Sequence, residues 1–220
     1  DQQIQPPHHP NKITATLIGG TAVLLWGLLA LFTTLTGKIP PFQLAAMSFG
    51  IATTFIVIKW LVRRENIVDH LRQPMGAWML GTIGLFGYHF FYFMALRNAP
   101  PVEAGLIAYM WPLLIVVGSA LLPGERLRWW HVAGAVAGLV GAVLLITDGR
   151  GLSGFKPEFT LGYVMAVCCA LTWSTYSILN RRFQHVPTDT VGGFCAATAI
   201  LALVCHIAFE TTVWPNGGLE

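Results

Sequence analysis

Charged residues are scarce in this sequence. Only 10% of its 220 residues are Asp, Glu, Lys or Arg, whereas soluble domains carry about a quarter. Hydrophobic residues make up 55% of the chain, and no Lys or Arg lies in the central part of a long apolar run. This composition argues against a water-soluble globule and predicts a polytopic membrane protein.

The sequence also lacks the short motifs of common hydrolases and metal sites. It contains no HExxH, no GxSxG and no CxxC. Ser119 and His131 are the only nucleophile and base that invite pairing, and a predicted turn separates them. We therefore expect no catalytic residue, no metal and no cofactor, and a membrane-embedded enzyme is the remote alternative.

Long apolar runs account for most of the chain. Each of seven runs has about the 20 residues that cross a hydrocarbon core about 30 Å thick. Transmembrane strands are about 10 residues long and alternate strictly, so these runs predict helices and an all-α bundle. The runs cover residues 13–36, 40–62, 76–97, 101–122, 129–147, 159–180 and 188–209.

The distribution of Lys and Arg predicts the orientation. If the N-terminus is cytoplasmic, nine of these residues lie on the inner side and four on the outer side, as the positive-inside rule requires. The net charge of +3 then reflects loops that face anionic lipid, and no nucleic-acid partner is expected. The inner set is Lys12, Lys59, Arg63, Arg64, Arg72, Arg126, Arg128, Arg181 and Arg182, and the outer set is Lys38, Arg97, Arg150 and Lys156.

The chain carries a weak internal repeat. A shift of 147 residues places Trp26-Gly27 on Trp173-Ser174 and Pro40 on Pro187, and it lays the first two apolar runs over the sixth and seventh. Because five is an odd number of helices, a second copy that follows them must have the opposite orientation in the membrane. The sequence thus predicts an inverted repeat of five helices, the plan of secondary transporters that bind solute near the midplane.

Three regions are expected from this repeat. Residues 1–12 are expected to be a disordered cytoplasmic lead, residues 13–147 the first five-helix repeat, and residues 159–220 the start of the second. A complete chain of this plan has ten helices and about 300 residues. We therefore expect that the seven helices present lack three that would come after them.

Several short motifs resemble one transporter family. In their order and spacing they are similar to the drug/metabolite transporter superfamily, in its EamA branch, and most closely to the YddG-like aromatic amino acid exporters of bacterial inner membranes. The resemblance implies ten helices, a central cavity and amino acid export. The matching motifs are Leu25-Trp26-Gly27, Ala95-Leu96-Arg97-Asn98-Ala99, Tyr109-Met110-Trp111-Pro112, Gly124-Glu125-Arg126-Leu127 and Leu171-Thr172-Trp173-Ser174.

The third run contains polar aromatic residues at membrane depth. Tyr88, His89 and Tyr92 have the spacing that places them on one side of a helix. Their polar tips need water or partners in hydrocarbon, which favours the wall of a wet cavity. Packing between helices, with the hydroxyls hydrogen-bonded, is the alternative.

The fourth run adds Tyr109 and Trp111, next to Pro112. Proline lacks an N–H, so Pro112 is expected to bend the helix and free the carbonyl of Ala108 as an acceptor for an ammonium group. A plain kink is the alternative. Helical geometry puts Trp111 off the face of Tyr109, and its inclusion rests only on the family resemblance.

The sixth run contributes Trp173, Tyr176 and Ser177 in a stretch rich in hydroxyl groups. In proteins of the family that this chain resembles, the tryptophan that matches Trp173 borders the central cavity. By the internal repeat its counterpart is Trp26. Packing alone is the alternative interpretation for all three residues.

The composition of this predicted cavity limits the solute. A nucleotide sugar would require Arg or Lys, and a cationic drug would require Asp or Glu, at the midplane. Rings, hydroxyls and carbonyls suit small neutral or zwitterionic amino acids, moved by alternating access in a bacterial inner membrane. His89 is the one candidate for proton coupling, because histidine has an ordinary pKa near 6.5, but facilitated movement is favoured.

Overall fold

A computed structural model describes residues 16–17, 19–21, 24–25, 39–120, 128–147, 149, 156–183 and 185–214. Residues 40–212 form one compact unit, and residues 1–39 with 213–220 form another. Few residues of the second unit are described, so the predicted lead at residues 1–12 and most of the first apolar run, including Trp26, lie outside the described residues. The helices and contacts described below belong to the unit of residues 40–212.

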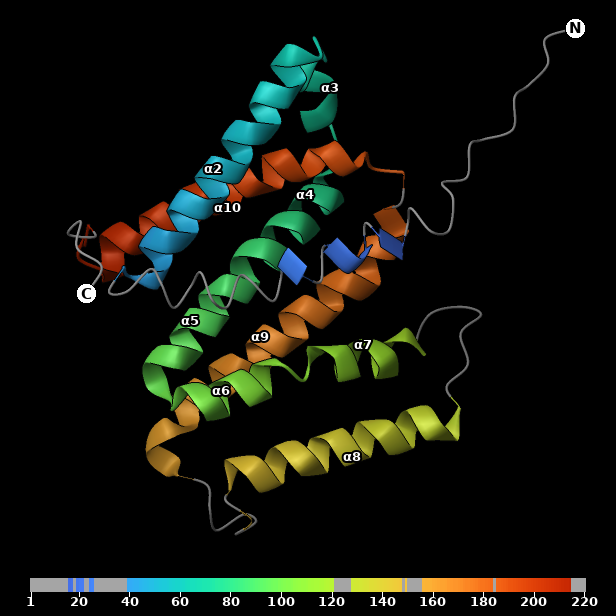
Figure 1. Ribbon diagram of the computed structural model, residues 1–220, viewed down its shortest axis with the longest axis vertical. Helices are drawn as coiled ribbons and strands as arrows, with labels where there is room; N and C mark the ends of the chain where they lie inside the picture. The colour runs from blue at the N-terminus through green and yellow to red at the C-terminus, as the bar shows by residue number, and fades with distance from the viewer. Residues whose placement is uncertain are drawn as a thin grey trace, which may run out of the picture. The chain divides into compact units, whose positions relative to one another are not determined.

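All regular elements of the described residues are helices, as the sequence predicted, and the described part contains no strand (Figure 1). Five helical segments are long and apolar enough to cross a membrane, and α8 is a shorter apolar helix. The α-helices are α2 (Pro41–Val62), α3 (Ile67–Leu71), α4 (Met75–Thr82), α5 (Tyr88–Asn98), α6 (Pro101–Ala108), α7 (Trp111–Ser119), α8 (Trp129–Ile146), α9 (Thr160–Leu179) and α10 (Val191–Phe209).

Short turns of other helix types join or extend these helices. The π-helical turn η1 (Ile83–Gly87) links α4 to α5, so the third span runs unbroken over Met75–Asn98. The 3-10 turns are η3 (Pro157–Phe159), η4 (Asn180–Phe183) and η5 (Thr188–Thr190). The ends of the five long spans and of α8 lie within about three residues of those predicted from the sequence.

Two antiparallel helix pairs organise the described bundle (Figure 1). In the pair of α2 and α10, Lys59 contacts Asp189 at one end, and the backbone of Phe42 contacts Glu210 at the other. Their spans, Pro41–Val62 and Thr188–Phe209, differ by the same 147 residues that align the sequence with itself. An inverted repeat requires this antiparallel arrangement, but the repeat as a whole stays a prediction.

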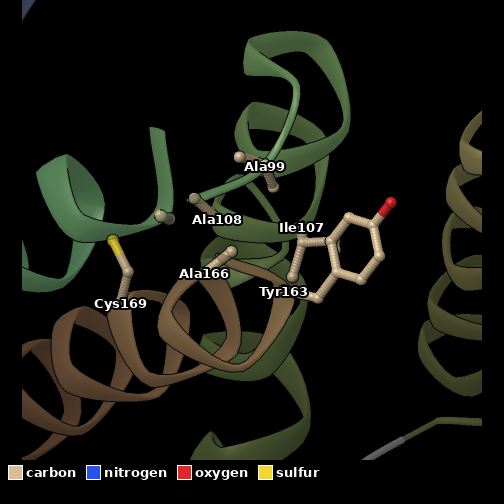
Figure 2. Close-up of a cluster of buried hydrophobic side chains, with 8 residues drawn as sticks. Ala99, Ile107, Ala108, Tyr163, Ala166 and Cys169 are labelled. Carbon is tan, nitrogen blue, oxygen red and sulfur yellow. The ribbon is translucent and has the colours of Figure 1, made fainter. Parts of the chain in front are cut away.

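The pair of α5 and α9 packs through small residues. Ala95 and Ala99 meet Ala166 of α9 and the alanines of α6 in a buried cluster (Figure 2). A Cβ added at Gly162 would collide with Ala99 and the backbone beside it. Small side chains let helix backbones approach closely, and this contact sets the distance between the third and sixth spans.

Candidate solute-binding site

The third span is distorted just before its polar aromatic residues. The π turn η1 contains Gly84 and Gly87, and Tyr88 begins the α-helix that comes next. Nδ1 of His89 donates a hydrogen bond of 2.7 Å to the carbonyl of Leu85, inside this turn. A π turn adds a residue to the helical turn and is found frequently at functional sites. It therefore changes the direction in which Tyr88 and the residues after it project.

The fourth span is interrupted at Tyr109–Met110, as the proline predicted. α6 ends at Ala108, and α7 begins at Trp111 with Pro112 in its first turn. Pro112 has no N–H to bond the carbonyl of Ala108. The interruption leaves Tyr109 65% exposed and places Trp111 at the start of a new helix.

Five of the predicted site residues form a continuous group of rings, which we call the aromatic cluster. Its centre is Tyr88, whose ring centroid lies 5.1 Å from that of Trp173 and 6.0 Å from that of Tyr92. Trp173 in turn lies 6.4 Å from Trp111 and 5.2 Å from Tyr176. These rings come from α5, α7 and α9, so the structure brings together residues that are far apart in the sequence.

The polar tips of the aromatic cluster have no hydrogen-bond partner among the described residues. All five of its residues are only half-buried. Within the described residues, no group is hydrogen-bonded to the hydroxyls of Tyr88, Tyr92 and Tyr176 or to the indole N–H groups of the two tryptophans. Polar groups in hydrocarbon require partners or water, so these tips are the groups of the cluster that could bind a polar solute.

Tyr109 is the one predicted tyrosine of the site that the structure does not bring into the aromatic cluster. No ring contact joins it to the cluster among the described residues, and it lies at the interruption between α6 and α7. Its exposure leaves its ring free to contact a solute.

His89 faces a different helix from its neighbour Tyr88. Its ring lies 5.1 Å from that of Phe49 on α2 and 5.2 Å from that of Tyr88. Successive residues of a helix point about 100° apart, so Tyr88 reaches α9 while His89 reaches α2. Because Nδ1 donates to Leu85, the other ring nitrogen is the one left to accept a proton or a hydrogen bond.

Tyr176 and Ser177 extend the site toward one end of α9. The ring of Tyr176 lies against Gly84, where a Cβ would collide with it. The hydroxyl of Ser177 donates to the carbonyl of Trp173 at 2.8 Å, so its own oxygen remains able to accept. Both residues line a pocket that is separate from the contact between Tyr88 and Trp173.

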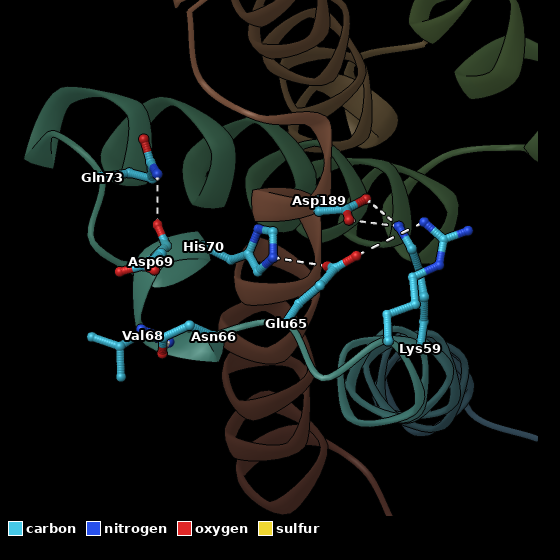
Figure 3. A network of polar contacts seen from close by, with 9 residues as sticks. Lys59, Glu65, Asn66, Val68, Asp69, His70, Gln73 and Asp189 are labelled. Carbon is cyan, nitrogen blue, oxygen red and sulfur yellow. Dashed lines mark hydrogen bonds and ion pairs between the residues drawn. The ribbon is translucent and has the colours of Figure 1, made fainter.

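Charged groups of the described residues gather at the two ends of the bundle. At one end, Lys59 holds Asp189 through hydrogen bonds of 2.5 and 2.7 Å, and His70 lies 3.0 Å from Glu65 (Figure 3). Atoms of Glu65, His70 and Asp189 approach within 4.8 Å of one another, close enough to ligate a cation. Lys59 already neutralises Asp189, so these contacts form an ion-pair network that joins α2 to η5.

A buried carboxylate organises the other end. Glu210 accepts hydrogen bonds from the backbone N–H groups of Phe42 and Gln43 at 3.1 and 3.0 Å, and so caps the start of α2. Arg97 donates to it at 2.5 Å, and Nδ1 of His206 lies 2.9 Å away. The carboxylate therefore ties α2, α5 and α10 together, outside the aromatic cluster.

These features match a known family. The model of the EamA-like transporter family fits residues 14–147. The chain belongs to this family. This EamA-like transporter is a multi-pass inner-membrane protein, and its named relatives are transporters and exporters, not enzymes.

Three curated relatives show how far this likeness extends. The aromatic amino acid exporter YddG of Ancylobacter novellus is 55% identical over 94% of this chain and 72% of its own length. The protein of the same name from Salmonella typhimurium is 24% identical, over 78% of this chain and 60% of its length. The pseudopaline exporter CntI of Pseudomonas aeruginosa is 26% identical, over 79% of this chain and 59% of its length.

A solved crystal structure supports the fold of this EamA-like transporter. It matches with a TM-score of 0.79 at 55% sequence identity and covers 94% of this chain and 71% of that chain. The helical bundle of the described residues is thus shared with an experimentally determined protein.

Sequence reasoning missed two features that shape the site. Only the pair of glycines at Gly84 and Gly87 hinted at the π turn, and glycines in a membrane helix more often serve packing. The role of Glu210 had no local sign, because its partners Phe42 and Arg97 are 168 and 113 residues away.

Proposed function

We propose that this EamA-like transporter exports small neutral or zwitterionic metabolites, chiefly aromatic and other amino acids. The observation that carries the proposal is the aromatic cluster, whose polar tips lack partners among the described residues. No Asp, Glu, Lys or Arg lies in the central part of the described spans. A solute that binds there must supply a ring or another apolar group together with balanced charge.

Each part of an aromatic amino acid has a counterpart in this site. A solute ring can stack on Tyr88 or Trp173 and gain about 0.5–1.5 kcal/mol beyond the burial of its area. The tyrosine hydroxyls and indole N–H groups can bind its carboxylate, and the helix break beside Pro112 offers backbone carbonyls to its ammonium group. A phosphorylated solute would find no cation here to offset its charge.

The relatives support the same solute class. The protein from Ancylobacter novellus that is 55% identical to this chain is named an aromatic amino acid exporter. The identity extends over 207 residues, which is 94% of the chain. We extend that solute class to this chain because of this sequence identity and because the aromatic cluster offers rings to an aromatic solute.

Movement by alternating access is the mechanism that fits this architecture. The matching bounds and antiparallel packing of α2 and α10 support an inverted repeat, whose two halves rock about a midplane site. The π turn in the third span and the interruption in the fourth lie beside the aromatic cluster. With a cytoplasmic N-terminus, the end that carries Lys59 and Asp189 faces the cytoplasm.

Counterflow in proteoliposomes tests the solute class. Vesicles that hold the full-length protein are preloaded with unlabelled solute and given radiolabelled phenylalanine, threonine or a nucleotide sugar outside. Phenylalanine is expected to accumulate transiently, threonine more slowly, and the nucleotide sugar not at all. Accumulation of the nucleotide sugar alone would show that the amino acid assignment is wrong, and protein-free vesicles serve as the control.

A further inference from the structure

A pocket lies beside the aromatic cluster, at the end of the bundle that carries Lys59 and Asp189. It has a volume of about 390 Å³ and lies between α4, the C-terminal end of α9, η4 and the start of α10. These elements adjoin one another in Figure 1. Sites for small molecules have volumes of about 300–1,000 Å³, so this pocket has room for an amino acid.

The lining of this pocket combines one cation with polar and apolar groups. Arg181 supplies a guanidinium, and Asn180 and Ser177 supply an amide and a hydroxyl. Leu80 and Phe194 are among the apolar residues of its wall. Among the described residues of the lining none carries a carboxylate, and the guanidinium, amide and hydroxyl groups beside an apolar wall suit a ligand with an anionic group and an apolar body.

The pocket and the aromatic cluster share one residue. Tyr176 lines the pocket, and its ring centroid lies 5.2 Å from that of Trp173. The same ring rests on Gly84, in the π turn that precedes Tyr88. The ring of Tyr176 therefore lies between the pocket and Trp173, and it belongs to both the pocket wall and the aromatic cluster.

The guanidinium of Arg181 supplies the positive charge that the aromatic cluster lacks. A zwitterion that leaves water must keep its carboxylate solvated or paired, and arginine binds carboxylates through two parallel hydrogen bonds. No Lys or Arg lies in the central part of the described spans, whereas Arg181 lies in η4, just after the C-terminal end of α9. A carboxylate can thus be captured by Arg181 before the side chain of the solute moves to the rings.

We propose that this pocket is the site where the exporter first binds its solute from the cytoplasm. Arg181 binds the carboxylate, the apolar wall contacts the side chain, and displacement of the Tyr176 ring opens the way to Trp173 and Tyr88. This inference rests on the proposed export of amino acids, and it adds a second binding site on the cytoplasmic side.

Transport measured separately from each side of the membrane tests the pocket. Full-length protein is reconstituted, and vesicles of inside-out and right-side-out orientation are compared for initial rates of phenylalanine uptake. Arg181→Gln is expected to raise the half-saturating concentration about tenfold from the cytoplasmic side, because the variant loses a charge-assisted hydrogen bond to the carboxylate. The maximal rate should be retained. The half-saturating concentration from the opposite side should not change.

The neighbouring arginine provides a matched control. Arg182 is exposed and does not line the pocket, so Arg182→Gln should leave both half-saturating concentrations unchanged. Phenethylamine, which lacks the carboxylate, should inhibit the wild type and Arg181→Gln equally from the cytoplasmic side.

Three outcomes would overturn the pocket assignment. In the first, Arg181→Gln matches the wild type, and in the second it changes both sides equally. In the third, it alters only the dependence of transport on phosphatidylglycerol, which would assign the pocket to a lipid headgroup. Failure of the proposed function looks different, because wild-type vesicles would then move no phenylalanine from either side.

Discussion

Arg97 and Glu210 form an ion pair of 2.5 Å that joins α5 to the end of α10. The carboxylate of Glu210 is 1% exposed and also caps α2, whereas the arginine side chain is 34% exposed. One buried charge thus holds three helices, and the removal of its carboxylate leaves several donors without an acceptor.

Glu210→Ala should therefore destabilise the protein by about 2–4 kcal/mol, because a partly buried arginine and two backbone N–H groups lose their acceptor. Thermal unfolding in detergent measures this change. Arg63→Gln is the control, because the 3.8 Å contact of Arg63 with Glu65 is largely exposed, and a shift under about 0.5 kcal/mol is expected. Equal stability of Glu210→Ala and the wild type would contradict the network.

Gly84 is expected to tolerate no side chain. In Gly84→Ala the added methyl group would collide with the ring and Cβ of Tyr176, so the helices must separate. We expect a loss of about 1–3 kcal/mol in thermal unfolding. Gly138→Ala, where an added Cβ would meet no described atom beyond the backbone of its own helix within 4 Å, should leave stability unchanged or raise it slightly. Equal stability of Gly84→Ala and Gly138→Ala would contradict the close approach of α9 to the π turn.

The orientation can be tested by labelling introduced cysteines with a membrane-impermeant maleimide. With the N-terminus in the cytoplasm, Lys156→Cys should react in intact cells, and Arg64→Cys only after the cells are made permeable. Both positions lie next to the predicted ends of spans. The native cysteines lie within helices and provide the background that the unmodified protein measures. The reverse labelling pattern would place the N-terminus outside.

Transport should depend little on an imposed pH gradient. His89 is the only histidine of the third span, and Nδ1 is held by the carbonyl of Leu85. No carboxylate lies in the central part of the described spans to exchange protons with it. Phenylalanine efflux from proteoliposomes at equal and unequal pH measures the effect. A strong acceleration that disappears in His89→Gln would show proton coupling through this residue.

Apolar length was sufficient to predict the helices but not their local distortions. The bounds of α2, α9 and α10 could be predicted from composition, because a bilayer sets the length of a span. The interruption at Tyr109 could be predicted from Pro112, since a missing N–H acts locally. The π turn depends on tertiary contacts, such as that of Tyr176 with Gly84, and the glycines at 84 and 87 do not encode it by themselves.

The sequence supplied the candidate residues of the site, which stay a prediction, but not the contacts between them. Residue type and spacing identified Tyr88, Tyr92 and Trp173 as polar aromatic groups at membrane depth, which is a property of the sequence alone. That Tyr88 meets Trp173 while His89 meets Phe49 depends on which helices pack together. The pocket at Arg181 had no sign in the sequence, where this residue marks only the end of a span.

The aromatic cluster is the centre of the proposed mechanism, and flux through ring-deletion variants tests it most directly. Phenylalanine counterflow is compared for the wild type, Tyr88→Ala, Trp173→Ala and, as control, Trp129→Ala, whose ring is 75% exposed at the start of α8. Loss of stacking and burial should reduce the subsaturating rate at least about fivefold in the first two variants at wild-type expression. Trp129→Ala should match the wild type. Unchanged flux in both Tyr88→Ala and Trp173→Ala would contradict an aromatic solute site at this cluster.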